Sequence, residues 1–190
     1  MLSDLITSKT RVKILSLFLQ DIEAMYHVRE IVRRVDEEIN AVRRELILLD
    51  KKGLLNKEKR GNRVYYFFDK NYPFLNDLVR INVKESGLGH DLIKNRVKLG
   101  NIKYAMISGK FARSQSTKDE VEMLIVGLVV LPELQLLVKK EEERRGKEIN
   151  YTVMTEEEFN FRKSRRDPFI FSIISGSRIM LIGDEEKFLV

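Results

Sequence analysis

The chain has 190 residues, 43% of them hydrophobic, and a formal net charge of +6. This apolar content supports a packed core and argues against a disordered chain, and the length allows one ordinary domain or two small ones. The sequence contains no cysteine, which excludes disulfides and thiolate metal sites. Because no export signal and no apolar run of bilayer length is present, we expect a cytoplasmic protein without a membrane partner.

The first elements are two short helices with a strand between them. Helical spacing of apolar residues predicts a helix over 7–20, which Thr7 or Ser8 can cap. A short strand is expected over 24–28, and a second helix over 29–35. The chain therefore begins as helix, strand, helix.

A third helix and a hairpin follow. Asp36 is the expected N-cap, and Gly53 is the expected stop of the helix. Its apolar stripe recurs every three or four residues, at Ile39, Val42, Leu46 and Leu49. Two strand-like runs, 54–59 and 63–68, are joined through a Gly-Asn pair that tolerates positive φ. This order of elements is that of a winged helix-turn-helix.

Polar and cationic side chains are expected on the outer face of the third helix and around the hairpin. Side chains on the outer face of a helix suit base edges in a major groove, and cationic side chains around a hairpin suit DNA phosphates. The expected DNA contacts are Asn40, Arg43 and Arg44 on the helix, Lys57, Lys59, Arg60, Asn62 and Arg63 at the hairpin, and Arg29 before them. The simpler alternative is a solvated charged surface.

The run from His27 to Phe74 resembles the winged helix-turn-helix of prokaryotic transcription regulators, and most closely those fused to a nucleotidyltransferase-like domain. The segments that carry the resemblance are REI, AVRREL, KKGLL and RGNRVYY. The resemblance implies a regulator that binds double-stranded DNA. Symmetric operators favour a homodimer, for which a helix expected over 72–85, with Pro73 in its first turn, is a candidate interface.

The second half alternates strands and helices. We place a domain boundary at 86–89, where the sequence is Ser-Gly-Leu-Gly. The expected elements are a short helix over 92–97, strands over 104–107, 123–126 and 149–154, a helix over 131–145, a helix capped by Thr155 and Glu158, and a helix or strand over 175–182. The fold class is thus α+β, with a winged helix-turn-helix over 1–85 and a small α/β domain over 90–190.

The run from Ala105 to Gly127 resembles the start of the DNA polymerase β-type nucleotidyltransferase fold, which implies a mixed sheet. In that family a Gly-Ser pair holds phosphates and three carboxylates bind Mg²⁺. This chain keeps Gly109, Ala112 and Arg113, but has Lys110 for the serine, Ser114 for a glycine, Glu120 and Glu122 for two aspartates, and Asn150 for the third carboxylate.

These substitutions predict that nucleotidyl transfer is lost and that no metal or other cofactor is bound. Glu120 and Glu122 are then vestigial metal positions, either of which could pair with Lys110. Gly109, Lys110 and Arg113 form a candidate nucleotide or anion pocket. The domain would serve as an effector-sensing, dimerising or partner-binding platform. The alternatives are an active metal-dependent nucleotidyltransferase targeted by its winged helix, and a winged-helix module that binds proteins.

Overall fold

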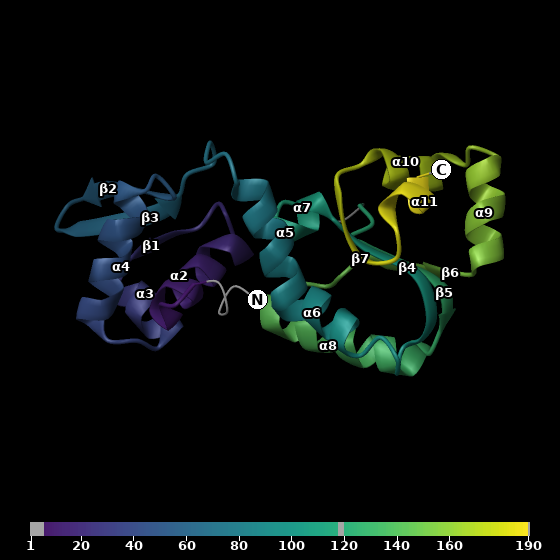
Figure 1. Cartoon of the computed structure of the whole chain (residues 1–190), viewed down its shortest axis with the longest axis horizontal. Helices are drawn as coiled ribbons and strands as arrows, with labels where there is room; N and C mark the ends of the chain where they lie inside the picture. Colours follow the sequence, from purple (N-terminus) through teal and green to yellow (C-terminus); the bar gives the residue numbers. More distant parts are fainter. Residues whose placement is uncertain (1–5, 118–119, 190) are drawn as a thin grey trace. The chain divides into compact units, whose positions relative to one another are not determined.

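The computed structural model describes residues 6–117 and 120–189, and the chain forms two compact units, Met1–Asn82 and Val83–Val190. Figure 1 shows the elements of both units. The division falls inside helix α5 (Leu75–Glu85) and not at 86–89, because Gly87 and Gly89 belong to helix α6 (Gly87–Lys94). Helix α5 begins at Leu75, so Pro73 lies in the preceding turn and not in the first turn of the helix.

The first unit has the topology of a winged helix. Its helices are α2 (Lys9–Gln20), α3 (Val28–Val35) and α4 (Ile39–Lys51). Its strands are β1 (Met25–His27), β2 (Leu55–Arg60) and β3 (Arg63–Phe68), which form an antiparallel sheet in the order β1-β3-β2. The predicted helices, short strand and hairpin are therefore confirmed.

The three helices and the sheet of this unit share an apolar core. Helix α2 contributes Phe18, and α4 contributes the predicted stripe, in which Val42, Leu46 and Leu49 are buried. Phe68, near the end of the hairpin, is buried as well. Burial of one face of α4 leaves its opposite face exposed.

The start of α4 differs from the prediction that Asp36 caps it. Asp36 ends α3 instead, in the left-handed conformation with φ 50°, and its N–H donates to the Val32 carbonyl. The cap of α4 is Glu38, whose carboxylate accepts from Asn40 N at 2.7 Å and Ala41 N at 2.9 Å. The link between α3 and α4 is short, and Asp36 ends α3 because aspartate tolerates positive φ.

The second unit contains a mixed four-stranded sheet in the order β6-β5-β4-β7. Strands β5 and β6 are parallel and the other pairs are antiparallel. The strands are β4 (Gly100–Ser108), β5 (Met123–Val129), β6 (Tyr151–Met154) and β7 (Arg178–Ile182). The helices after α6 are α7 (Gly109–Ala112), α8 (Leu131–Arg145), α9 (Glu156–Ser164), α10 (Pro168–Ser175) and α11 (Glu185–Leu189).

Most of these elements follow the prediction. The mixed sheet, the helix from Leu131 to Arg145 and the Thr155 cap of α9 are confirmed, and the structure shows Gly146 ending α8 in the left-handed conformation. The segment over 175–182 contains a strand, β7, and α6 lies earlier than the expected helix over 92–97. Helices α10 and α11 were not predicted, because α10 is short and apolar on most sides and so lacks a clear helical period.

The sheet of the second unit is covered on both faces, with α9, α10 and α11 on one side and α6 and α8 on the other (Figure 1). One face carries a cluster built around Tyr104, Phe159 and Phe188, whose last two rings stack at 5.2 Å. Neighbouring positions along the strands, such as Ile107 and Ile125, are buried too and belong to the opposite face. In the two described ranges no helix is long and apolar enough to cross a membrane.

Candidate nucleic-acid interface and candidate anion site

The outer face of α4 presents Asn40, Arg43 and Arg44, as predicted. All three side chains are exposed, and they lie opposite the buried stripe of the helix. Within residues 6–117 and 120–189, neither arginine makes an ion pair. The two guanidinium groups are therefore available to an anion from outside the unit.

Two carboxylates on the flanks of this face are neutralised by partners from other elements. Glu45 accepts from Arg11 Nε at 2.7 Å and from Ser8 Oγ at 2.6 Å. Burial alone would raise the pKa of Glu45, but these hydrogen bonds and the Arg11 charge outweigh it, so the pKa is lowered. Asp50 accepts from Lys57 Nζ at 2.5 Å, and this pairing raises the pKa of Lys57. The outer face keeps a net positive charge.

A further acid near this face is Glu38, at the start of α4. Its hydrogen bonds from the Asn40 and Ala41 amides lower its pKa, as do the charges of Arg44 and Arg43. The carboxylate is thus ionised and engaged by the helix terminus, where negative charge is favoured by the helix dipole.

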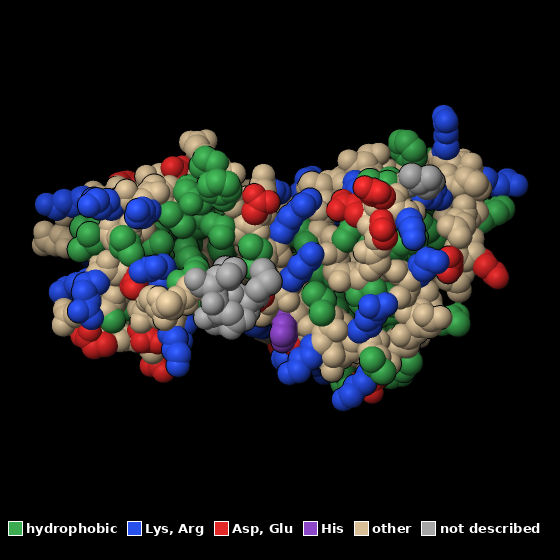
Figure 2. All heavy atoms as spheres, viewed as in Figure 1, with side chains coloured by type: hydrophobic (Ala, Val, Ile, Leu, Met, Phe, Trp, Pro, Cys, Tyr) green, Lys and Arg blue, Asp and Glu red, His purple; other side chains and the backbone are tan. Residues whose placement is uncertain are grey.

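The cations of the hairpin do not form one cluster, although the sequence places them around one turn. Directly paired residues share a face of a sheet, and Lys57 is paired with Tyr66 and Lys59 with Val64. Arg60 and Arg63 are paired with each other, so they lie on the opposite face. Figure 2 shows several separate Lys and Arg side chains at the hairpin end of the first unit.

The hairpin cations also differ in whether they form ion pairs or hydrogen bonds within the first unit. Arg60 donates from Nε to Glu58 Oε1 at 2.9 Å and lies 5.7 Å from the centre of the Tyr65 ring. Lys59, Arg63 and the turn residue Asn62 are exposed, and none of them makes an ion pair or side-chain hydrogen bond with another described residue. Arg29 on α3 is also exposed and makes no ion pair or side-chain hydrogen bond with another described residue.

The predicted anion pocket of the second unit is only partly assembled. Ser108 caps the short helix α7, and Gly109 N donates to the Ser177 carbonyl at 2.7 Å. A Cβ at Gly109 would lie 2.3 Å from Ser177 Oγ, so a side chain there would require Ser177 to shift. The Gly109 amide that would hold a phosphate is therefore already bound within the protein.

Lys110 pairs with Glu120, one of the two partners that the sequence left open, and this pairing lowers the pKa of Glu120. Both residues line an open cavity of about 280 Å³ together with Ser108, Phe169 and Ser177. Gly109 and Arg113 are not among its lining residues. The structure thus brings only Lys110 of the predicted three to this cavity.

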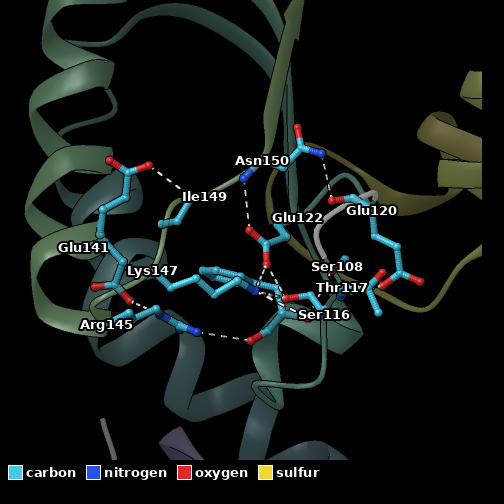
Figure 3. A network of polar contacts seen from close by, with 12 residues as sticks. Ser108, Ser116, Thr117, Glu120, Glu122, Glu141, Arg145, Lys147, Ile149 and Asn150 are labelled. Atoms are coloured by element: carbon cyan, nitrogen blue, oxygen red, sulfur yellow. Dashed lines mark hydrogen bonds and ion pairs between the residues drawn. The ribbon is translucent and has the colours of Figure 1, made fainter.

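Glu122 is not solvated, because only 1% of the residue is exposed. Its carboxylate accepts from Lys147 Nζ at 2.7 Å, from Asn150 N at 3.0 Å and from the Ser116 hydroxyl. Figure 3 shows the Glu122 and Glu120 carboxylates directed toward different partners. Each of the two carboxylates is therefore paired with its own lysine. A shared metal would instead require both carboxylates to point toward one ion.

Sequence reasoning missed Lys147, which lies just after the end of α8. Its ammonium also donates to Ser116 Oγ at 2.9 Å, and Asn150 Nδ2 donates to the Glu120 carbonyl at 3.1 Å. No local pattern marks this contact, since it depends on how the chain returns after α8 toward β6.

No family model matches the chain, and no curated protein is significantly similar to it. Among solved structures, reduced HlyU from Vibrio cholerae N16961 matches 42% of this chain and 83% of its own, with 23% sequence identity and a TM-score of 0.34. A similarity of this size assigns no family, so the winged-helix description rests on the strand pairing and helix order given above.

Proposed function

We propose that this chain is a sequence-specific transcription regulator that binds double-stranded DNA. The observation that carries the proposal is the exposed row of Asn40, Arg43 and Arg44 on α4, beside flanking acids that are neutralised from elsewhere. A helix with such a face fits a major groove, where asparagine suits adenine and arginine suits guanine.

The hairpin and α3 would supply the contacts to DNA phosphates. Lys59, Arg63 and Arg29 are exposed and unpaired among the described residues, so their charges are available without breaking an internal ion pair. Lys57 and Arg60 would first have to leave Asp50 and Glu58. Phosphate contacts of this kind fix the orientation of a protein on DNA and carry no base specificity.

For the second unit we infer an effector-sensing, dimerising or partner-binding role without nucleotidyl transfer. The pairing of Glu120 with Lys110 and of Glu122 with Lys147 supports this inference, because each cation occupies the surroundings of a carboxylate that a metal would require. We propose a homodimer because palindromic operators match a twofold axis. In α5, the candidate interface, Leu75 and Val79 are already buried within the chain.

The test compares DNA selection and affinity of the wild type with those of Arg43→Ala/Arg44→Ala. We expect the wild type to enrich a consensus from random duplexes and to bind it less tightly as salt rises, since phosphate contacts release counterions. The double variant should lose that selection, with a loss of about 1–3 kcal/mol for each arginine that reads a guanine.

A matched control is Lys94→Ala/Lys98→Ala, which removes the same charge from exposed positions of the second unit. It should keep the consensus. Absence of salt-sensitive binding by the wild type, or an equal loss of selection in the control, would contradict the proposal. Metal-dependent turnover of nucleoside triphosphates by the wild type would contradict the inference about the second unit.

A further inference from the structure

Ile47 lies on the same exposed row of α4 as the candidate DNA contacts. It follows Arg44 by three residues, Arg43 by four and Asn40 by seven, and these spacings place side chains on one helix face. Ile47 is 60% exposed, whereas its neighbours Leu46 and Leu49 are buried. The core therefore does not use this side chain.

Single exposed apolar residues are common on protein surfaces, so exposure alone decides nothing. What distinguishes Ile47 is its surroundings. The other exposed side chains of α4 are polar or cationic, and the acids at positions 45 and 50 are bound by Arg11 and Lys57. Ile47 is thus the apolar member of a row that is otherwise suited to DNA.

An apolar side chain in a major groove has one chemically matched feature to contact, the C5-methyl group of thymine. Isoleucine is β-branched and stiff at χ1, so little side-chain freedom is lost when it is fixed against that methyl. Cytosine lacks the methyl group, and this contact therefore distinguishes a T·A pair from a C·G pair.

We propose that Ile47 is a specificity-determining residue that recognises a thymine methyl group in the operator. The proposal rests on the proposed function, because it requires α4 to lie in a major groove. One helical turn separates Ile47 from Arg43 and Arg44, a rise of about 5.4 Å. With the helix axis along the groove, the thymine lies about one to two base pairs from the bases that the arginines contact, on the side away from Asn40.

The experiment uses the full chain and the consensus that the wild type selects. Each thymine of the consensus is replaced in turn by deoxyuridine, which removes the methyl group and keeps every hydrogen-bonding atom. We expect one position per half-site at which this replacement weakens wild-type binding about fourfold, the fold-change for burial of one methyl group at about 0.8 kcal/mol.

Ile47→Ala should bind the thymine and deoxyuridine duplexes equally at that position, and Ile47→Val should retain part of the difference. Leu128→Ala is the matched control, since Leu128 is an aliphatic residue of the second unit that is 69% exposed. It should respond to deoxyuridine as the wild type does. Thermal unfolding should show that all three variants are folded, because the altered side chains are outside the core.

Salt-sensitive, sequence-selective binding with no response to deoxyuridine would overturn the role of Ile47 and leave the regulator proposal standing. An unchanged deoxyuridine response in Ile47→Ala would overturn it as well. Absence of salt-sensitive DNA binding in the wild type would overturn both proposals together.

Discussion

At the scale of single residues, Glu122 has the clearest structural role. It is buried, and a lysine, a serine hydroxyl and a backbone amide bind its carboxylate. Replacement by glutamine leaves the Lys147 ammonium without its counter-charge. Because the Lys147 side chain is 45% exposed and stays hydrated, the loss comes mainly from the hydrogen bonds of the buried carboxylate, and we expect Glu122→Gln to lower the free energy of unfolding of the second unit by about 1–3 kcal/mol.

The sign of the change in the free energy of unfolding separates a structural role of Glu122 from a metal-binding role. Carboxylates gathered to hold a metal repel each other when the metal is absent, so loss of one would stabilise the protein in a chelating buffer. Denaturant unfolding in such a buffer measures the difference. Glu120→Gln, at an exposed ion pair, should leave the free energy of unfolding almost unchanged. A neutral or stabilising Glu122→Gln would refute the structural role.

At the scale of elements, the hairpin is the part whose contribution to DNA binding can be isolated. Arg63 is exposed and unpaired among the described residues, so we expect it to contact phosphate. Arg63→Ala should weaken binding on all duplexes equally and reduce the slope of log affinity against log salt by about 1, without a change of consensus. Quantitative binding at several salt concentrations measures the slope.

The matched control for the hairpin is Lys139→Ala, which removes a charge from an exposed position on α8. Its salt slope should equal that of the wild type. A change of the selected consensus in Arg63→Ala would instead mean that the hairpin reads bases.

The elements of the first unit could be predicted because their sequences repeat with the period of the structure. In α4, three of the four predicted stripe positions are buried, and the hairpin has the predicted two-residue turn. The cap of α4 could not be placed from the pattern, since the choice between Asp36 and Glu38 depends on one φ angle. Helices α10 and α11 are too short for a period to show.

The candidate sites were predictable only where the interacting residues are close in sequence or on one helix face. The row of Asn40, Arg43 and Arg44 followed from helical spacing, and the resemblance narrowed the partner of Lys110 to Glu120 or Glu122, of which the structure pairs it with Glu120. The Glu122–Lys147 pair joins residues 25 positions apart through a return of the chain. Such a contact depends on tertiary structure, which no local pattern encodes.

At the scale of the whole molecule, the two units have separate cores. Phe18 is fully buried in the first unit and Phe188 in the second. Because each unit buries its own apolar residues, we expect denaturant unfolding in two transitions. Phe18→Ala should shift one transition and Phe188→Ala the other, each by about 3–5 kcal/mol, the usual cost of emptying a large core position.

Tyrosine fluorescence and circular dichroism during a urea titration follow the transitions, and the salt-sensitive DNA binding that we propose for the first unit assigns one transition to it. Leu189→Ala is a matched control, because Leu189 neighbours Phe188 in α11 and is 41% exposed. It should shift neither transition appreciably. If Phe18→Ala and Phe188→Ala both shift one common transition, the two cores are coupled. The second unit would then stabilise the first unit directly, and a ligand bound to the second unit would change the stability of the unit that we propose to bind DNA.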